Sequence, residues 1–181
     1  MADPVLHDAV TLRHFASCGR LNICELLHSA LPIPRWTEAV QGELQRGAGN
    51  GNADCSTVLV QHWLGAPIVP TTADQGAIYR LRVGLNGGAY PPSADAGEAE
   101  SIFFAHQLGG LFATDDNAAH AFASRRLGPT RVIDSVDILR LAVRAGHVTA
   151  ADAAASAIAI RAAGRHLRRV HPITLTDSYF K

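Results

Sequence analysis

Short apolar segments that alternate with longer helical segments constrain the fold of this chain most strongly. Strands are predicted at about 4–8, 31–34, 67–70, 110–114 and 131–133. Helices are predicted at about 11–29, 38–44, 75–85, 98–105, 120–127, 135–145 and 149–163, with a break in the first at Gly19. A flexible loop is expected at 47–53, and 56–61 fits either a strand or a helix. This alternation predicts an α/β fold with a central parallel sheet flanked by helices.

The composition indicates a globular protein that folds as one domain. The chain has 181 residues, of which 48% are hydrophobic and 18% charged, and this balance excludes a disordered chain. No apolar run is long enough to cross a membrane, and acids and Arg13 interrupt the N-terminal region, so neither a membrane partner nor a signal peptide is expected. Cys18, Cys24 and Cys55 lack the spacing of a zinc site, which favours thiols in a reducing cytoplasm.

Acidic residues occur after predicted strands, at the start of the helix predicted at 98–105 and, in the case of Glu43, within the helix predicted at 38–44. These are Asp8, Glu43, Glu98, Glu100, Asp115 and Asp116. In parallel sheets the functional site lies beyond the carboxyl ends of the strands, so acids from separate chain positions can converge there. Gathered carboxylates are typical ligands of a hard cation, Mg²⁺ or Mn²⁺, and such sites assist phosphodiester chemistry.

Each of these acids also has a purely structural interpretation. Asp8 and Asp115 can cap the helices that follow them, and acids in the first turn of a helix suit its dipole. Glu98 and Glu100 lie two residues apart and diverge by about 200° around a helix, so they cannot face one ion equally. Helix geometry alone does not choose between them.

The sequences Gly-Glu-Ala-Glu at 97–100 and Thr-Asp-Asp at 114–116 occur together with an Asp after the first strand. With the segments at 19–27 and 138–146, this pattern resembles the PIN-domain nucleases, which include the VapC-type toxins; the resemblance runs from about residue 4 to 165. It implies a three-layer PIN-like fold. Residues 1–181 would form a single domain, with 147–181 as a helical C-terminal extension of that domain.

The resemblance also implies a function and a site. It implies an Mg²⁺- or Mn²⁺-dependent endoribonuclease that cleaves single-stranded RNA, acting as a toxin with a cognate antitoxin protein and forming a homodimer in the cytoplasm. The candidate catalytic carboxylates are Asp8, Glu43, Glu100 and Asp116. Only the resemblance favours Glu43 over Glu38 of the same helix, and it favours Glu100, the acid directly before the apolar run, with Glu98 as a close second. The candidate metal ligands are Asp8, Glu98, Glu100, Asp115 and Asp116. The Thr114 hydroxyl would form a hydrogen bond to one of these ligands and orient it.

The formal net charge is zero, but the charges are unevenly distributed along the chain. Residues 1–120 hold six Arg and Lys against twelve Asp and Glu, whereas residues 121–181 hold ten against four. The basic third suits an RNA backbone, and the predicted contacts are Arg161, Arg165, Arg168 and Arg169. The alternative is that the two parts simply compensate across the fold.

The sequence leaves two other functions open. Ala9 and Val10 follow Asp8 where the resembled family usually has a hydroxyl, and this favours a PIN-like binding or regulatory module without catalysis. The segment at 147–169 superficially resembles a DNA-binding helix-turn-helix, although its alanines are explained more simply by core packing.

Overall fold

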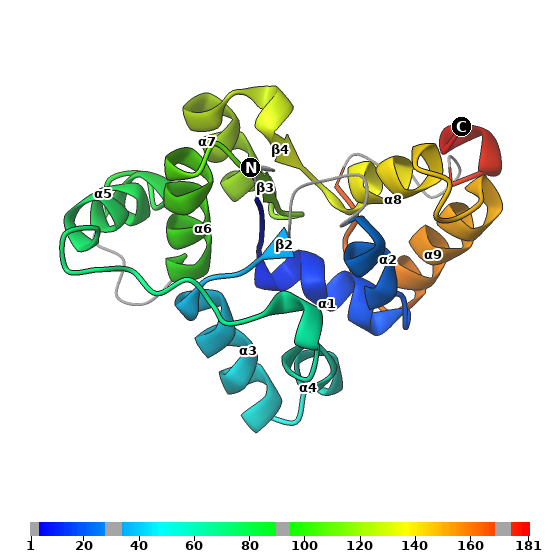
Figure 1. Ribbon diagram of the computed structural model, residues 1–181, viewed down its shortest axis with the longest axis horizontal. Helices are drawn as coiled ribbons and strands as arrows, with labels where there is room; N and C mark the ends of the chain where they lie inside the picture. Colours follow the sequence, from blue (N-terminus) through cyan, green and yellow to red (C-terminus); the bar gives the residue numbers. More distant parts are fainter. Residues whose placement is uncertain (1–3, 28–33, 90–94, 169–174) are drawn as a thin grey trace.

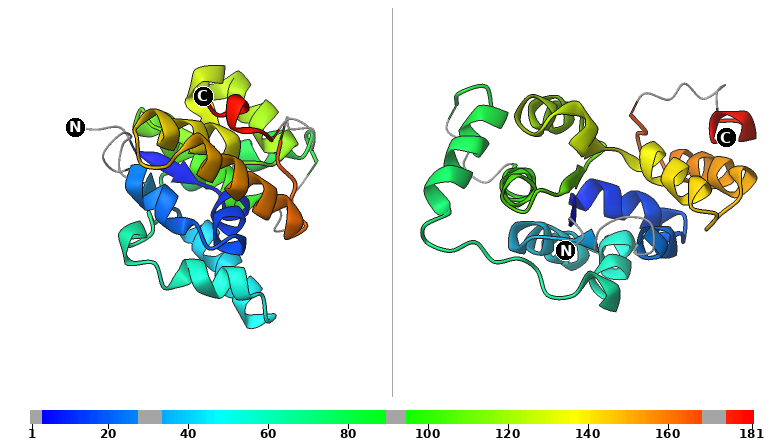
Figure 2. Two further views of the ribbon diagram at one scale, coloured as in Figure 1. Left: turned by 90° about the vertical axis from the view of Figure 1, so that its right-hand side faces the viewer. Right: turned by 45° about the horizontal axis from the view of Figure 1, so that its top comes forward.

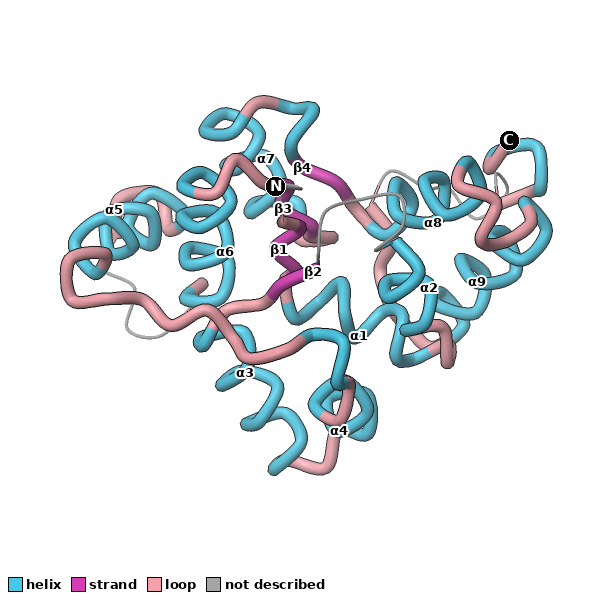
Figure 3. Tube along the Cα trace, viewed as in Figure 1, coloured by secondary structure: helices cyan, strands magenta, loops and turns pink. Residues whose placement is uncertain are grey.

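A parallel sheet lies at the centre of the protein, surrounded by helices (Figure 1). The computed structural model describes residues 4–27, 34–89, 95–168 and 175–181. Its four strands are β1 (Val5–His7), β2 (Pro34–Arg35), β3 (Leu111–Ala113) and β4 (Val132–Ile133), in the order β2-β1-β3-β4. Figure 3 shows how short these strands are beside the helices. The predicted α/β class with a central parallel sheet is confirmed.

Successive residues on the strands point to opposite faces of the sheet. Leu6, Phe112 and Val132 lie in register across three strands and belong to one buried cluster. The next residues of the same register, Ala113 and Ile133, belong to a second cluster. The period of two therefore gives the sheet two apolar faces, and each is covered by its own helices.

The first cluster is formed by three helices that lie together. They are α5 (Gln75–Leu85), α6 (Ala96–Gln107) and α7 (Asn117–Leu127). In the right-hand view of Figure 2, α5 and α6 lie at the opposite end of the molecule from α8 (Ser135–Arg144) and α9 (Ala150–Ala162). The layers are thus helix, sheet and helix.

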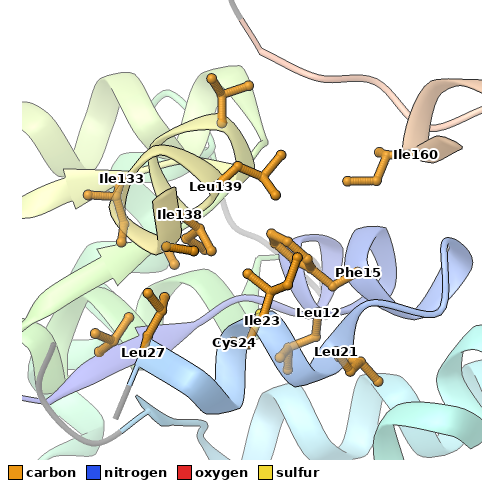
Figure 4. Close-up of a cluster of buried hydrophobic side chains, with 14 of the residues drawn as sticks. Leu12, Phe15, Leu21, Ile23, Cys24, Leu27, Ile133, Ile138, Leu139 and Ile160 are labelled. Atoms are coloured by element: carbon orange, nitrogen blue, oxygen red, sulfur yellow. The ribbon is translucent and has the colours of Figure 1, made fainter. Parts of the chain in front are cut away.

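The second cluster is larger and joins α8 and α9 to the N-terminal helices. These are α1 (Ala9–Ser17), α2 (Leu21–Leu26), α3 (Glu38–Gly49) and α4 (Ala53–Leu59). Figure 4 shows Leu12 and Phe15 of α1 among side chains from α2 and α8. Gly19 separates α1 from α2 with φ +68°, a left-handed conformation that favours glycine, so the predicted break is confirmed.

Several sequence-based boundaries agree with the structure and others do not. The helix predicted at 75–85 is α5, and the ambiguous segment at 56–61 lies largely in α4. The loop predicted at 47–53 is confined to residues 50–52, because α3 continues to Gly49 and α4 begins at Ala53, where Asn52 caps it by accepting hydrogen bonds from two backbone N–H groups. The strand predicted at 67–70 is a single parallel bridge between Thr37 and Ile68. Residues 31–33 of another predicted strand lie outside the described residues.

The segment 147–181 is helical only in part. It contains α9, which begins with the predicted capping box of Thr149 and Asp152, and the one-turn 3-10 helix η5 (Asp177–Tyr179). Two further 3-10 turns are η2 (His62–Leu64) and η3 (Pro129–Arg131). Across the described ranges, no helix combines the length and apolar character needed to cross a membrane.

Candidate metal centre

The neighbouring strands β1 and β3 lie at the point of the sheet where the strand order reverses, and their carboxyl ends are at the same edge. From β1 the chain moves to β2 on one side, and later returns to β3 on the other side of β1. Loops that leave two neighbouring strands in opposite directions open a crevice between them, where α/β proteins bind their ligands. Asp8 follows β1 and Thr114 follows β3, so both lie at this crevice.

Asp8 is fully buried at the start of α1. Its Oδ2 atom accepts a 2.9 Å hydrogen bond from the Thr114 hydroxyl. Its Oδ1 atom is also buried, and no hydrogen-bond partner for it occurs in the described part of the chain. A buried acceptor without a partner is costly, so Asp8 presents one oxygen that is suited to a ligand.

Two glutamates lie close to Asp8. Burial, and then the negative charges of Glu98 and Glu43, raise the pKa of Asp8 well above its usual value. The hydrogen bond from Thr114 opposes this shift, and the backbone of Val10 opposes it to a smaller extent. Three carboxylates, from the start of α1 and from α3 and α6, therefore interact at one end of the sheet.

A glycine permits the close approach of α3 and α6 at this point. A Cβ atom added to Gly97 would lie 3.1 Å from Cγ2 of Val40 and 3.5 Å from Oε2 of Glu43. The Glu43 carboxylate therefore sits against the first turn of α6, beside Glu98. Both glutamates line a cavity of about 240 Å³, together with Asp95 and Arg46. Burial raises the pKa of Glu43, and the charges of Arg13 and Arg46 oppose this rise.

Glu98 is the most strongly shifted of these glutamates. Its pKa is raised to about 7, mainly by burial and then by the neighbouring charges of Glu43, Asp95 and Asp116. Because the charges that act most strongly on Glu98 are all acidic, they oppose its ionisation near neutral pH, and a bound cation would favour it.

Asp116 connects this group to α7. It is exposed, caps α7 by accepting a 2.7 Å hydrogen bond from the Ala119 N–H, and donates its own N–H to the Thr114 hydroxyl at 3.1 Å. One oxygen is thus used by the cap. Its effect on the pKa of Glu98 places its charge near the cluster formed by Asp8, Glu43 and Glu98, called the carboxylate cluster below.

Glu100 has a different position from the one preferred on sequence grounds. Its Oε2 atom accepts a 2.9 Å hydrogen bond from the Ala39 N–H, in the first turn of α3. Burial raises its pKa, and hydrogen bonds from the Ala39 N–H and the Thr37 side chain oppose the rise. The structure therefore favours Glu98 over Glu100, because α6 turns Glu98 toward Asp8 and Glu100 toward the N-terminus of α3.

Asp115 is engaged by other side chains and lies on a different side of the β3 terminus. It accepts hydrogen bonds from the hydroxyl and the N–H of Ser135 and from the Thr11 hydroxyl, and it contacts Nδ1 of His14 at 3.2 Å. These contacts tie β3 to α1 and to the start of α8. The oxygens of Asp115 are therefore occupied by contacts that stabilise the fold. The hydroxyl that reaches Asp8 comes from Thr114, not from Thr11.

The arginines proposed for RNA binding do not form a stripe on one helix. Arg161 lies in the last turn of α9, whereas Arg165 and Arg168 follow that helix. Arg165 forms an ion pair with Asp54 of α4, and Nε of Arg168 lies 3.6 Å from Asp134. Arg169 lies outside the described residues. Two of these charges are therefore partly compensated inside the fold.

Two acids that precede helices were not identified from the sequence. Asp95 precedes α6 with φ +57° and accepts a hydrogen bond from Asn86, which brings its charge beside Glu98. Asp134 directly follows β4, is 1% exposed and caps α8. The signal for Asp134 was present, since it follows a predicted strand in the same way that Asp8 does.

The donor set suits a hard divalent cation, but its carboxylates do not converge on one point. Within the described ranges, no three His, Cys, Asp or Glu side chains are close enough to hold a metal ion as they stand. Oδ1 of Asp8 has no hydrogen-bond partner among the described residues, and the pKa values of Asp8 and Glu98 are raised. Arg13 and Arg46 oppose the rise in the pKa of Glu43, so positive charge offsets the acids of this site only in part. Ion binding at this site would therefore require side-chain rotation.

Comparisons of the chain with protein-family models, curated proteins and solved structures find no match.

Proposed function

We propose that this protein is a metal-dependent endoribonuclease with a PIN-like arrangement of its α/β fold, acting on single-stranded RNA. The observation that supports this most directly is the buried Asp8, whose Oδ1 has no hydrogen-bond partner among the residues that the structure describes, while Glu98 and Glu43 act on its charge. Three acids gathered at a strand end repel one another, and Arg13 and Arg46, which act on Glu43, offset this repulsion only in part, so a bound cation would stabilise the cluster. The location at the switch point of the sheet agrees with a ligand site.

In this proposal Asp8, Glu43 and Glu98 hold Mg²⁺ or Mn²⁺, and Asp116 contributes from the edge of the site. All four offer carboxylate oxygens, which these hard cations prefer. When bound, such an ion supplies Lewis acidity toward a phosphodiester and lowers the pKa of its water.

Thr114 and Asp116 orient the carboxylate cluster through hydrogen bonds. Thr114 fixes the orientation of Asp8 through its hydrogen bond, and the Asp116 N–H in turn fixes the Thr114 hydroxyl. Without a cation, Glu98 retains a proton up to about pH 7. Cation binding therefore competes with protonation, and the site is expected to fill more readily as the pH rises.

The test is cleavage of a single-stranded RNA by the purified protein with millimolar Mn²⁺, Mg²⁺ or a chelator. Asp8→Asn and Glu43→Gln should each reduce the cleavage rate by at least about 100-fold, since ligand loss removes the ion that assists the reaction. Glu38→Gln is the matched control, because Glu38 is an exposed acid of the same helix as Glu43. Metal-independent cleavage, or equal cleavage by wild type and Asp8→Asn, would reject the proposal.

The alternative of a PIN-like binding or regulatory module without catalysis is favoured by one observation. The carboxylates of the described residues do not form a ready-made ion site. In that case Mn²⁺ would raise the melting temperature without RNA cleavage, or would have no effect. The toxin role, the cognate antitoxin, the homodimer and the cytoplasmic location stay predictions from the resemblance.

A further inference from the structure

A second cavity lies between α5, α6 and α7, away from the carboxylate cluster. It has a volume of about 410 Å³, within the range of about 300–1,000 Å³ that is typical of small-molecule sites. It shares no lining residue with the cavity beside Glu43 and Glu98. Figure 1 shows α5, α6 and α7 next to one another, with the label of α5 at the left edge of the molecule.

The floor of this cavity is apolar. Ile102 and Phe103 of α6 are 1% and 8% exposed, and Leu127 of α7 is 8% exposed. Leu81 of α5 and Ala77 complete the apolar wall. A floor made of aromatic and branched side chains favours the hydrocarbon part of a ligand.

The rim of the cavity is basic. Arg80 of α5, His106 of α6 and Arg126 of α7 line it, and all three are exposed. Among the lining residues that the structure describes, none is an Asp or Glu. The guanidinium of Arg126 lies 5.5 Å from the ring centroid of Phe122, which restricts its position beside the opening.

From this charge complementarity we propose that the cavity binds a small amphipathic organic anion, with its apolar part on Phe103 and its carboxylate at Arg80 and Arg126. A carboxylate accepts paired hydrogen bonds from a guanidinium, and three basic groups from three helices surround the same opening. The volume suits one ring with a short chain rather than a folded segment of a partner. This site is independent of the proposed nuclease function, because it uses none of the cluster residues.

The experiment is isothermal titration calorimetry with 4-phenylbutyrate and with 4-phenylbutanol, which has the same ring and chain length but no charge. The acid should bind saturably at one site and the alcohol more weakly. Arg126→Gln should weaken binding of the acid about three- to fivefold, which is the strength expected of one exposed ion pair. Ala77→Leu places a larger side chain in the cavity wall and should weaken the binding of both compounds, since it removes cavity volume.

Arg125 provides a matched control. It neighbours Arg126 on α7, is exposed and lies 5.9 Å from the same Phe122 ring, but it does not line the cavity. Arg125→Gln should leave binding of the acid unchanged, whereas equal weakening by both variants would show a general charge effect and overturn the proposal. Equal binding of acid and alcohol, absence of saturable binding, or binding only of a longer acidic peptide would also overturn it.

Discussion

The Thr114 hydroxyl donates a 2.9 Å hydrogen bond to Oδ2 of Asp8, which joins the ends of β1 and β3. This bond uses one oxygen of Asp8 and leaves Oδ1 for another partner. Residues 106 positions apart in the chain therefore define the centre of the candidate site together.

Thr114→Val should weaken Mn²⁺ binding about tenfold, because a supporting hydrogen bond orients the carboxylate that holds the ion. Thr114→Ser keeps the hydroxyl and should bind Mn²⁺ nearly as tightly as the wild type. Calorimetric titration with Mn²⁺ measures the effect. Equal affinities of the valine and serine variants would show that the hydrogen bond does not position Asp8.

The stability of the metal-free protein should fall as the pH rises from about 4.5 to about 7. Glu98 has a pKa raised to about 7 in the folded protein against an ordinary value of 4.5, so in this window the unfolded chain releases a proton that the folded protein keeps. Glu98→Gln should flatten this dependence. Urea unfolding at a series of pH values, with a chelator present, measures it. Stability that rises across this window, with the same slope in both proteins, would contradict the environment described for Glu98.

Asp115→Asn should destabilise the protein by about 3 kcal/mol, since it disturbs a buried acceptor of several hydrogen bonds. The increase in melting temperature caused by Mn²⁺ should persist, because Asp115 is committed to Ser135, Thr11 and His14. Thermal unfolding with and without Mn²⁺ tests both effects. Loss of the Mn²⁺ response at unchanged stability would instead make Asp115 a ligand.

Arg165 and Asp54 should be coupled by less than about 1 kcal/mol, because both side chains are about one-quarter exposed to solvent. A double-mutant cycle with Arg165→Gln and Asp54→Asn, followed by urea unfolding, measures this coupling.

RNA affinity and its salt dependence in the same variants show whether Arg165 also contacts the RNA backbone. If Arg165→Gln lowers the slope of log RNA affinity against log salt concentration by about one, this would support the RNA contact predicted from the sequence.

The sequence predicted the framework well where a local physical signal was strong. Apolar segments before Asp8 and Asp115 indicated β1 and β3, and Thr149 with Asp152 indicated the start of α9. The glycines at 47–51 misled, because Gly47 and Gly49 lie within α3 and Asn52 begins the next helix. Tertiary packing outweighed the local preference there.

The choice between Glu98 and Glu100 could not be made from the sequence. Both lie in the first turns of α6, and each fits the same structural and functional patterns. The packing of α3 against α6 distinguishes them. Glu100 accepts a hydrogen bond from the Ala39 N–H, whereas Gly97 allows the close approach that brings Glu98 beside Glu43. The position of a neighbouring helix is a long-range property that helix periodicity does not contain.

The most direct test of the proposed centre compares Glu98→Gln with Glu100→Gln. Calorimetry measures Mn²⁺ affinity, and single-stranded RNA cleavage is followed under the same conditions. Glutamine at position 100 still offers an oxygen to the Ala39 N–H, so this variant serves as the matched control. Glu98→Gln should lose at least about tenfold in Mn²⁺ affinity together with most of the cleavage, while Glu100→Gln keeps both. The reverse result, or full Mn²⁺ affinity and cleavage in both variants, would contradict a metal centre built on Asp8, Glu43 and Glu98.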